Sequence, residues 1–394
     1  MVLRLFGEQM RRHLLAKHHL TPRTAGTNTE VIAEDLLGLH ATGTTSPYLQ
    51  LLARMTAFRR SDLDRALYGD RTLARVRCMR GTVFVVTRAL LPVVLAATRR
   101  TIEPPSTRYL ATLGVSVEDF LRLAERIERE LERTEEALSA AELRLRTGAE
   151  TSLSGVVNLM CDQARLVRDR PVGTWKSRTF TYRRFSDVFP HVDSIDEDDA
   201  VRLLTERYLR AHGPVTVDDL VWWSGLGLRR LHSALRDLGD AVVTVGIDGA
   251  AGEYLVHKDD IDVLSHSEQN VVPTVVSLLP ELDPYPMSRK GREMMLGPEQ
   301  KPYTTDRSGN VTSLILVDGR AAGVWDVSEA LEPAVRIHLF DKRPPHVLDL
   351  IQDRAVVVGR FWFESRVPTR ETASMAPLNE RRAGAVLSPL AETE

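Results

Sequence analysis

A histidine and a threonine separated by one residue are the side chains in this sequence best suited to chemistry. His40-Ala41-Thr42 ends one predicted helix and precedes another. A neutral imidazole can take a proton from water near neutral pH, and a threonine hydroxyl can orient that water. Both residues also have simpler uses. A histidine at a helix end commonly contacts the last carbonyl groups, and a threonine commonly caps a helix or forms a turn.

Basic side chains suited to phosphate contacts occur in four segments: around the end of a predicted helix, in a hairpin turn, beside Trp175, and in the long irregular stretch Asp283–Asn310. We predict DNA contacts for Arg54, Arg59, Arg60, Arg80, Lys176, Arg178, Arg289, Lys290 and Arg292. Solvated helix faces and ion pairs with nearby carboxylates are the alternative uses of such residues.

The charge distribution favours a nucleic-acid partner for the N-terminal part of the chain. Residues 1–110 contain 17 Lys and Arg against 8 Asp and Glu, whereas the remainder contains 35 against 46. A basic end on a chain of net charge -2 is the pattern of an electrostatic DNA footprint. An arginine-rich composition by itself would produce the same bias.

Three helices and a hairpin are predicted to position the His40-Ala41-Thr42 segment. We predict helices at Leu3–His19, Val31–Leu39, Tyr48–Phe58 and near Leu63–Tyr68, and strands at Leu73–Cys78 and Thr82–Thr87. Ser46-Pro47 favours a helix start, because proline fits the first turn of a helix. Three helices followed by a two-stranded hairpin are typical of a winged-helix unit.

The same order of elements recurs twice along the chain. A second set has helices at Val117–Glu135, Ser139–Leu145 and Ser152–Gln163 and strands at Leu166–Asp169 and Thr179–Tyr182. A third set has helices at Asp198–His212, Val217–Ser224 and Gly227–Leu238 and strands at Ala241–Val245 and Glu253–Val256. Repetition of one supersecondary unit favours a tandem array.

The last part of the chain changes character, because strand-like runs dominate it. These runs are Val275–Leu279, Thr312–Val317, Ala322–Val327, Ala334–Leu339 and Arg354–Trp362. We therefore predict an α+β protein with three tandem winged-helix (helix-turn-helix) units, at residues 1–112, 113–192 and 193–268. A small β-rich C-terminal domain with a basic loop, at residues 269–394, follows them.

Several classes of protein are disfavoured. Two cysteines, Cys78 and Cys161, make no disulfide framework and have no partner at metal-ligand spacing, so we expect no metal, no cofactor and a reducing cytoplasm. No apolar run reaches the ~18–20 residues of a membrane span. The first residues, Met1–Leu20, lack the compact apolar core of a signal peptide. Tandem units in one chain need no dimerisation, so we expect a monomer.

Segments at both ends of the chain resemble one known family. Leu37–Leu49, the turn Met79-Arg80-Gly81-Thr82, Leu278–Pro284 and Leu316–Trp325 resemble the winged-helix DNA glycosylases typified by AlkZ and YcaQ. The resemblance covers essentially the whole chain. The motif of that family is most often Gln-x-Gln or Gln-x-Asp, and the matching positions here hold His40 and Thr42, which is a departure.

The resemblance implies a monofunctional DNA glycosylase, with His40 and Thr42 as its catalytic residues. Its substrate would be a bulky N7-alkylated purine in double-stranded DNA, and its role self-resistance or crosslink repair. Such a purine already carries positive charge, so the species to stabilise is the oxocarbenium-like sugar. A protonated His40 would oppose that charge. The departure from the motif supports one alternative, a non-catalytic DNA-binding regulator or damage sensor. A protein–protein scaffold is a third possibility, because winged helices also serve that role.

Overall fold

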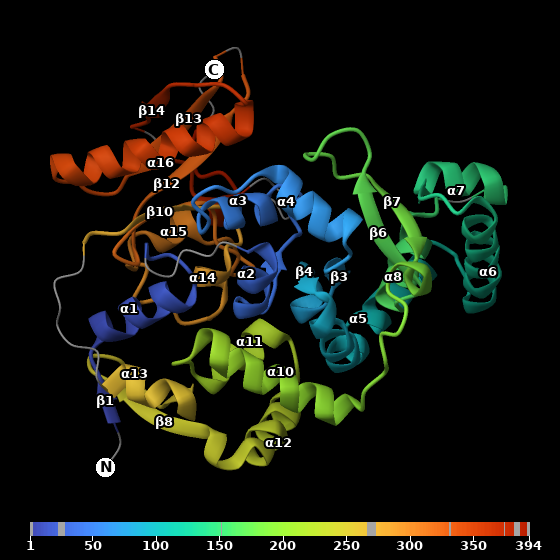
Figure 1. The fold of residues 1–394 in the computed structure, drawn as a ribbon, viewed down its shortest axis with the longest axis horizontal. Helices are drawn as coiled ribbons and strands as arrows, with labels where there is room; N and C mark the ends of the chain where they lie inside the picture. The colour runs from blue at the N-terminus through green and yellow to red at the C-terminus, as the bar shows by residue number, and fades with distance from the viewer. Residues whose placement is uncertain are drawn as a thin grey trace.

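The computed structural model describes residues 3–22, 28–150, 152–265, 273–330, 332–373, 375–381 and 387–391. Within these residues the chain forms four separate sheets, three of three strands and one of five, with helices between and around them (Figure 1). The mixed α+β character predicted from the sequence is confirmed. The predicted boundary at residues 268 and 269 lies outside the described residues.

The first group of elements holds the His40 segment. Its helices are α1 (Gly7–Lys17), α2 (Thr29–Asp35), α3 (Ser46–Leu52), α4 (Arg60–Asp64) and the long α5 (Leu91–Thr112). Its strands are β2 (Leu39–His40), β3 (Leu73–Arg77) and β4 (Val83–Thr87), in the order β2-β4-β3. The predicted helix at Val31–Leu39 is wrong at its end, because Leu39 and His40 pair with Val85 and Phe84 as a strand.

The second group repeats the part of this order that runs from α2 to β4. It contains α6 (Val117–Thr134), β5 (Leu138–Ser139), α7 (Ala140–Thr147), α8 (Ser154–Asp162), β6 (Leu166–Pro171), β7 (Phe180–Arg184) and α9 (Phe185–Val188). Serine side chains cap the start of two of the helices. The Ser116 hydroxyl accepts from Asp119 N at 3.0 Å, and that of Ser139 accepts from Glu142 N at 3.2 Å.

The third group includes a strand from the start of the chain. Its elements are α10 (Glu197–His212), α11 (Val217–Ser224), α12 (Leu228–Leu238), β8 (Val242–Ile247), β9 (Tyr254–His257) and α13 (Ile261–Ser265). The strand β1 (Leu3–Leu5) runs parallel to β8, with Leu3 opposite Val245. The predicted helix at Leu3–His19 is therefore wrong over its first residues, because Leu5 fills the core of this distant sheet.

The C-terminal group is a five-stranded sheet with one long helix. It contains β10 (Val276–Leu279), α14 (Pro284–Met287), α15 (Lys301–Thr304), β11 (Leu314–Val317), β12 (Arg320–Ser328), β13 (Ala334–Leu339), α16 (Pro345–Phe363) and β14 (Thr369–Glu371). The strand predicted at Arg354–Trp362 is wrong. Val347, Ile351, Ala355 and Val358 recur at helical spacing and bury one face of α16 against the sheet.

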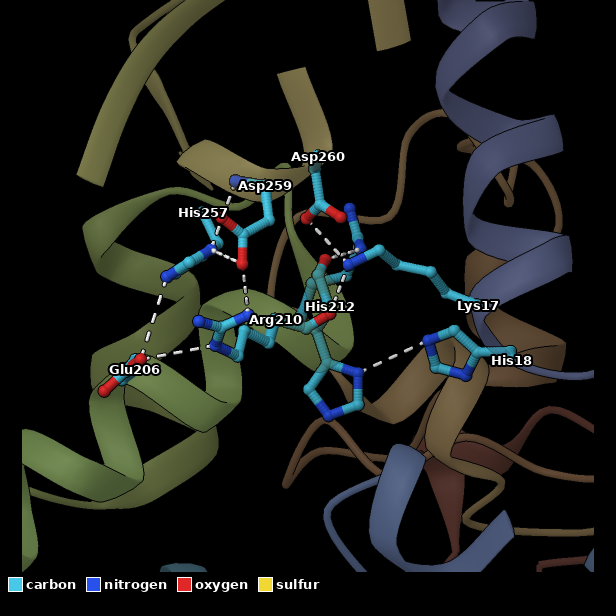
Figure 2. A network of polar contacts seen from close by, with 9 residues as sticks. Lys17, His18, Glu206, Arg210, His212, His257, Asp259 and Asp260 are labelled. Carbon is cyan, nitrogen blue, oxygen red and sulfur yellow. Dashed lines mark hydrogen bonds and ion pairs between the residues drawn. The ribbon is translucent and has the colours of Figure 1, made fainter. Parts of the chain in front are cut away.

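Shared cores and polar contacts join these groups. One apolar cluster combines α5, α10 and α11 with the β3–β4 hairpin, and another combines α1 with the C-terminal sheet. Figure 2 shows a polar network where α1 meets α10, in which Lys17 Nζ lies 2.7 Å from Asp260 Oδ2 and His18 Nε2 lies 3.3 Å from His212 Nδ1. No helix in the described ranges is long and apolar enough to cross a bilayer.

Candidate active-site cleft

A cleft of about 710 Å³ lies where the loop after His40, the β6–β7 hairpin and the loop after β10 meet. It is lined by Ala41, Thr42, Gly43, Thr44, Arg75, Val83, Ser154, Asn158, Arg168, Arg178, Phe180, Tyr182, Glu281, Leu282, Asp306, Arg307, Ser308, Asn310, Leu378, Arg381 and Leu387. The first, second and C-terminal groups of elements contribute residues to it.

Arginines give the cleft its charge. Of the described lining residues, five are arginines and two are carboxylates. The five are Arg75, Arg168, Arg178, Arg307 and Arg381. Because the positive groups predominate, the cleft is suited to a negatively charged ligand such as a phosphodiester.

Two of these arginines, Arg75 and Arg168, have guanidinium nitrogen atoms without a hydrogen-bond acceptor among the described residues. Arg75 is 3% exposed and its guanidinium lies over the ring of Phe180, 4.9 Å from the centroid. Arg168 Nη2 donates to Asn158 Oδ1 at 2.8 Å. Among the described residues, Arg75 Nε, Arg75 Nη1 and Arg168 Nη1 find no hydrogen-bond acceptor. Because these nitrogen atoms are buried, the two guanidinium groups act on the cleft through their positive charge.

Thr42 lies in this cleft and is exposed there. The strand β2 stops at His40, and Ala41 N donates to Val83 O at 2.7 Å before the chain turns away. Thr42 Oγ1 accepts from Val83 N at 3.4 Å. Its hydroxyl is thus within reach of whatever occupies the cleft.

His40 lies in a different cavity. Its side chain is buried and lines a space of about 10 Å³ with Arg80, Phe84 and Trp223 among the walls. The imidazole is 4.9 Å from the Phe84 ring, and its Nδ1 has no partner among the described residues. Burial, and then the charge of Arg80, lowers the pKa of His40 to about 3, so the ring is neutral at physiological pH. The idea that His40 and Thr42 hold the same water does not fit this arrangement.

Glu281 is the functional candidate that the sequence analysis missed. It follows β10 directly and lines the cleft opposite Gly43. Burial raises the pKa of its carboxyl group, while the positive charge of Arg178 and the hydroxyl of Ser46 act in the opposite direction. The available signal was only an acidic residue inside the apolar Leu278-Leu279-Pro280-Glu281-Leu282 run.

The DNA contact predicted for Arg54 is wrong for this structure, because the side chain is fully buried. Arg54 Nη1 and Nη2 donate to the two carboxylate oxygens of Asp283 at 2.8 and 2.7 Å. Its Nε donates to His18 O at 2.8 Å, and Nη1 also donates to Gln50 O at 2.9 Å. The guanidinium therefore joins the first group of elements to the C-terminal one.

Two arginines predicted in the basic loop are likewise structural. Arg289 is 2% exposed, and its Nη2 donates to His212 O at 2.9 Å. Arg292 is 6% exposed, and its Nε donates to Pro286 O at 2.7 Å. Burial, more than the charge of Arg80, lowers the pKa of Arg292 to about 10. The DNA contacts predicted for these two are therefore wrong, whereas Lys290 between them is exposed.

Arg80 is held by the protein on several sides. Its guanidinium lies 3.9 Å from the centre of the Trp222 ring. Its Nη2 lies 3.4 Å from both Ser308 O and Asn310 Oδ1. These contacts anchor the turn of the β3–β4 hairpin against α11 and the loop 306–310.

The remaining predicted contacts lie at the surface. Arg59 and Arg178 are exposed, and Arg178 lines the cleft. Arg60 lies over the Trp175 ring at 5.3 Å and pairs with Glu364. Because Arg60 is partly engaged, Arg59 and Arg178 are the better placed of these three for phosphate.

The tip of the β6–β7 hairpin contacts α16 and the loop 41–45, which we call the motif loop. Lys176 O accepts from Thr44 Oγ1 at 3.1 Å, and Lys176 Nζ pairs with Glu329 while lying 4.5 Å from the centre of the Trp362 ring. The Trp175 ring stands edge-on to Tyr48 at 5.2 Å. The hairpin tip thus forms one fixed wall of the cleft.

In the described ranges, no three His, Cys, Asp or Glu side chains lie close enough together to hold a metal ion.

Comparisons with known proteins agree with this architecture. The model of the DNA glycosylase AlkZ-like family matches residues 33–359. An interstrand DNA cross-link repair glycosylase from Streptomyces sahachiroi is 25% identical over 180 residues, which are 44% of this chain and 46% of that protein. The matched part thus spans less than half of that relative.

The solved structure of the Streptomyces sahachiroi DNA glycosylase AlkZ has the same fold. The two superpose with a TM-score of 0.74 at 21% identity, over 93% of this chain and 99% of that one. The resemblance seen in the sequence is confirmed. Because the family match extends over most of the chain, this protein belongs to the AlkZ-like DNA glycosylase family.

Proposed function

We propose that this protein is a monofunctional DNA glycosylase that hydrolyses the N-glycosidic bond of bulky N7-alkylated purines in double-stranded DNA. The observation that carries the proposal is the arginine-lined cleft into which the motif residue Thr42 opens. We place the activity in the cytoplasm, with the protein acting as a monomer.

The fold supports this use of DNA. We interpret the three helix-and-hairpin groups as winged-helix units that wrap the duplex, with the cleft between the first and second. The exposed Arg178 would bind a phosphate oxygen beside the damaged nucleotide, and Arg75 and Arg168 would add positive charge to the cleft wall. Binding would then weaken steeply with added salt, since phosphate contacts release counterions.

The chemistry fits a cationic leaving group. An N7-alkylated purine leaves as a neutral base, so the protein needs to supply no strong acid. Its task is to hold the nucleotide, orient a water molecule with Thr42 and stabilise the sugar cation. No lysine is found among the described residues that line the cleft, so an amine nucleophile for a lyase reaction is missing there.

The name of one relative supports a role in crosslink repair, and we propose self-resistance as the other role. The Streptomyces sahachiroi protein is described as an interstrand DNA cross-link repair glycosylase. We propose a related role here, with an adduct bulky enough to be handled in a cleft of about 710 Å³.

A non-catalytic DNA-binding protein is the second candidate, and the burial of His40 away from the cleft favours it. Release of 7-methylguanine and of a bulky alkylated purine from duplex DNA separates the two, measured for wild type, Thr42→Ala and His40→Ala. Release by wild type that falls in Thr42→Ala supports the glycosylase. Duplex binding without release by wild type supports the binder. If His40→Ala is folded but no longer releases the base, the His40 imidazole has a catalytic role.

A further inference from the structure

The carboxylate of Glu281 occupies the part of the cleft next to the motif loop. Glu281 follows β10, and Thr42 and Gly43 follow β2, so two loops far apart in the chain face each other there. Both Thr42 and Glu281 line the cleft. A reacting sugar that reached Thr42 would therefore also lie near this carboxylate.

Gly43 is what lets the two loops approach so closely. A Cβ atom at position 43 would lie 2.5 Å from Glu281 Oε1 and 2.5 Å from Ser46 Oγ, a separation that real side chains essentially never show. Any other residue at this position would require the Glu281 carboxylate and the Ser46 hydroxyl to move. The packing of the motif loop is thus fitted to Glu281.

Glu281 is also held by rigid neighbours. Leu282 N donates to Val311 O at 2.8 Å, and the next residue is Asp283, which forms the buried pair with Arg54. The carboxylate is consequently presented from a fixed loop, and needs little reorganisation during a reaction.

The other acidic residue of the cleft is committed elsewhere. Asp306 Oδ1 accepts from Ser308 N and Asn310 N at 2.8 Å each, and Oδ2 accepts from Asn310 Nδ2 at 3.0 Å. Asp306 therefore shapes its own turn. Of the described carboxylates in the cleft, this leaves Glu281 as the one that can face a cationic substrate.

We propose that Glu281 is the catalytic carboxylate of this protein, contacting the sugar cation and the attacking water. The inference rests on the glycosylase function proposed above. It explains how a His-x-Thr segment can suffice, because the negative charge comes from the C-terminal part of the chain.

The step balances without a cofactor. The C1′–N9 bond breaks and its electron pair goes to the purine, which leaves as a neutral base. The water oxygen forms the new bond to C1′, and its proton passes to the Glu281 carboxylate and then to solvent. A cationic nucleotide and water thus give an abasic sugar, a neutral base and a proton.

The role requires the ionised carboxylate, so the rate should rise with pH through its pKa. Burial raises that pKa, and the two groups that oppose the shift are Arg178 on the β6–β7 hairpin and Ser46 on α3. His40 does not share this pH range, because its pKa is lowered to about 3.

Glu281→Gln tests the inference, since it keeps the shape and removes the charge. Single-turnover release of 7-methylguanine from a duplex is followed across pH, beside binding of the same duplex by fluorescence anisotropy. We expect release to slow by about 100-fold or more, with unchanged binding and without the acid limb of the wild-type pH profile. Glu299→Gln, an exposed glutamate outside the cleft, is the matched control and should behave as wild type.

Gly43→Ala gives a second variant that leaves the carboxylate in place but displaces it. Release should slow, because the new methyl group needs the space of Glu281 Oε1. If wild type releases base and Glu281→Gln matches its rate, the inference fails and the glycosylase stands. Equal losses of binding and release in Glu281→Gln would make Glu281 structural and also overturn the inference. If wild type binds the duplex but releases nothing, the proposed function itself fails.

Discussion

Replacing Arg54 should destabilise the protein without acting on DNA recognition directly. The Arg54 and Asp283 side chains are both 0% exposed and are joined by two hydrogen bonds. Removing the guanidinium leaves the Asp283 carboxylate buried, with Tyr285 N as a donor at 2.9 Å. Breaking a buried ion pair on one side costs about 3–5 kcal/mol of unfolding free energy. The acceptors His18 O and Gln50 O would lose their donor as well.

Chemical denaturation measures the free energy of unfolding of Arg54→Ala, of Arg59→Ala and of the double variant Arg54→Met with Asp283→Leu. Arg54→Ala should lose about 3–5 kcal/mol, whereas exposed Arg59→Ala should stay within about 0.5 kcal/mol of wild type. Arg54→Met with Asp283→Leu should recover much of the loss, because a well-packed apolar pair avoids the uncompensated charge. An Arg54→Ala protein of wild-type stability that binds duplex DNA poorly would refute the structural assignment.

Two further predictions concern charge in and near the cleft. Arg178→Met should weaken duplex binding and reduce the dependence of log affinity on log salt by about 0.9, because the phosphate contact of this exposed cleft arginine is lost. Anisotropy titrations at several salt concentrations measure that slope, and an unchanged slope would mean that Arg178 does not contact DNA. His40→Gln should flatten the pH dependence of stability. The pKa of His40 is lowered to about 3 in the fold from 6.5, so the unfolded chain binds a proton first as pH falls. Wild type should therefore lose about 1.4 kcal/mol per pH unit from this group below about pH 6.5, levelling off near pH 3. Denaturant unfolding between about pH 7 and about pH 5 tests this, and equal slopes for the two proteins would contradict the burial of His40.

Local patterns predicted most of the secondary structure. The patterns along the sequence predicted the helices α6 and α7 and the β3–β4 and β6–β7 hairpins. These signals depend on neighbours in the sequence, so the chain itself carries them. The strand predicted at Arg354–Trp362 failed because its apolar residues also recur at helical spacing, and packing on the sheet selects the helix α16.

Features that depend on distant residues could not be predicted. The strand β1 needs β8 as its partner, 242 residues along the chain by the pairing of Leu3 with Val245. Arg54 reads as a surface residue until Asp283 is placed beside it. The cleft could not be predicted either, because Thr42, Arg75 and Glu281 are far apart in the sequence and come together only in the folded protein. Charged residues inside apolar runs were the local signals for it, namely Arg75 in Leu73-Ala74-Arg75-Val76 and Glu281 in Leu278-Leu279-Pro280-Glu281-Leu282.

The most direct test of the central claim is detection of the released base. A duplex carrying one N7-alkylated guanine is incubated with the purified protein, and free alkylguanine and abasic sites are quantified by mass spectrometry and by strand cleavage at abasic sites. We expect the two products to appear in equal amounts and to depend on the protein. Saturated binding of the duplex, with neither product above the protein-free rate for a small or a bulky adduct, would contradict the claim.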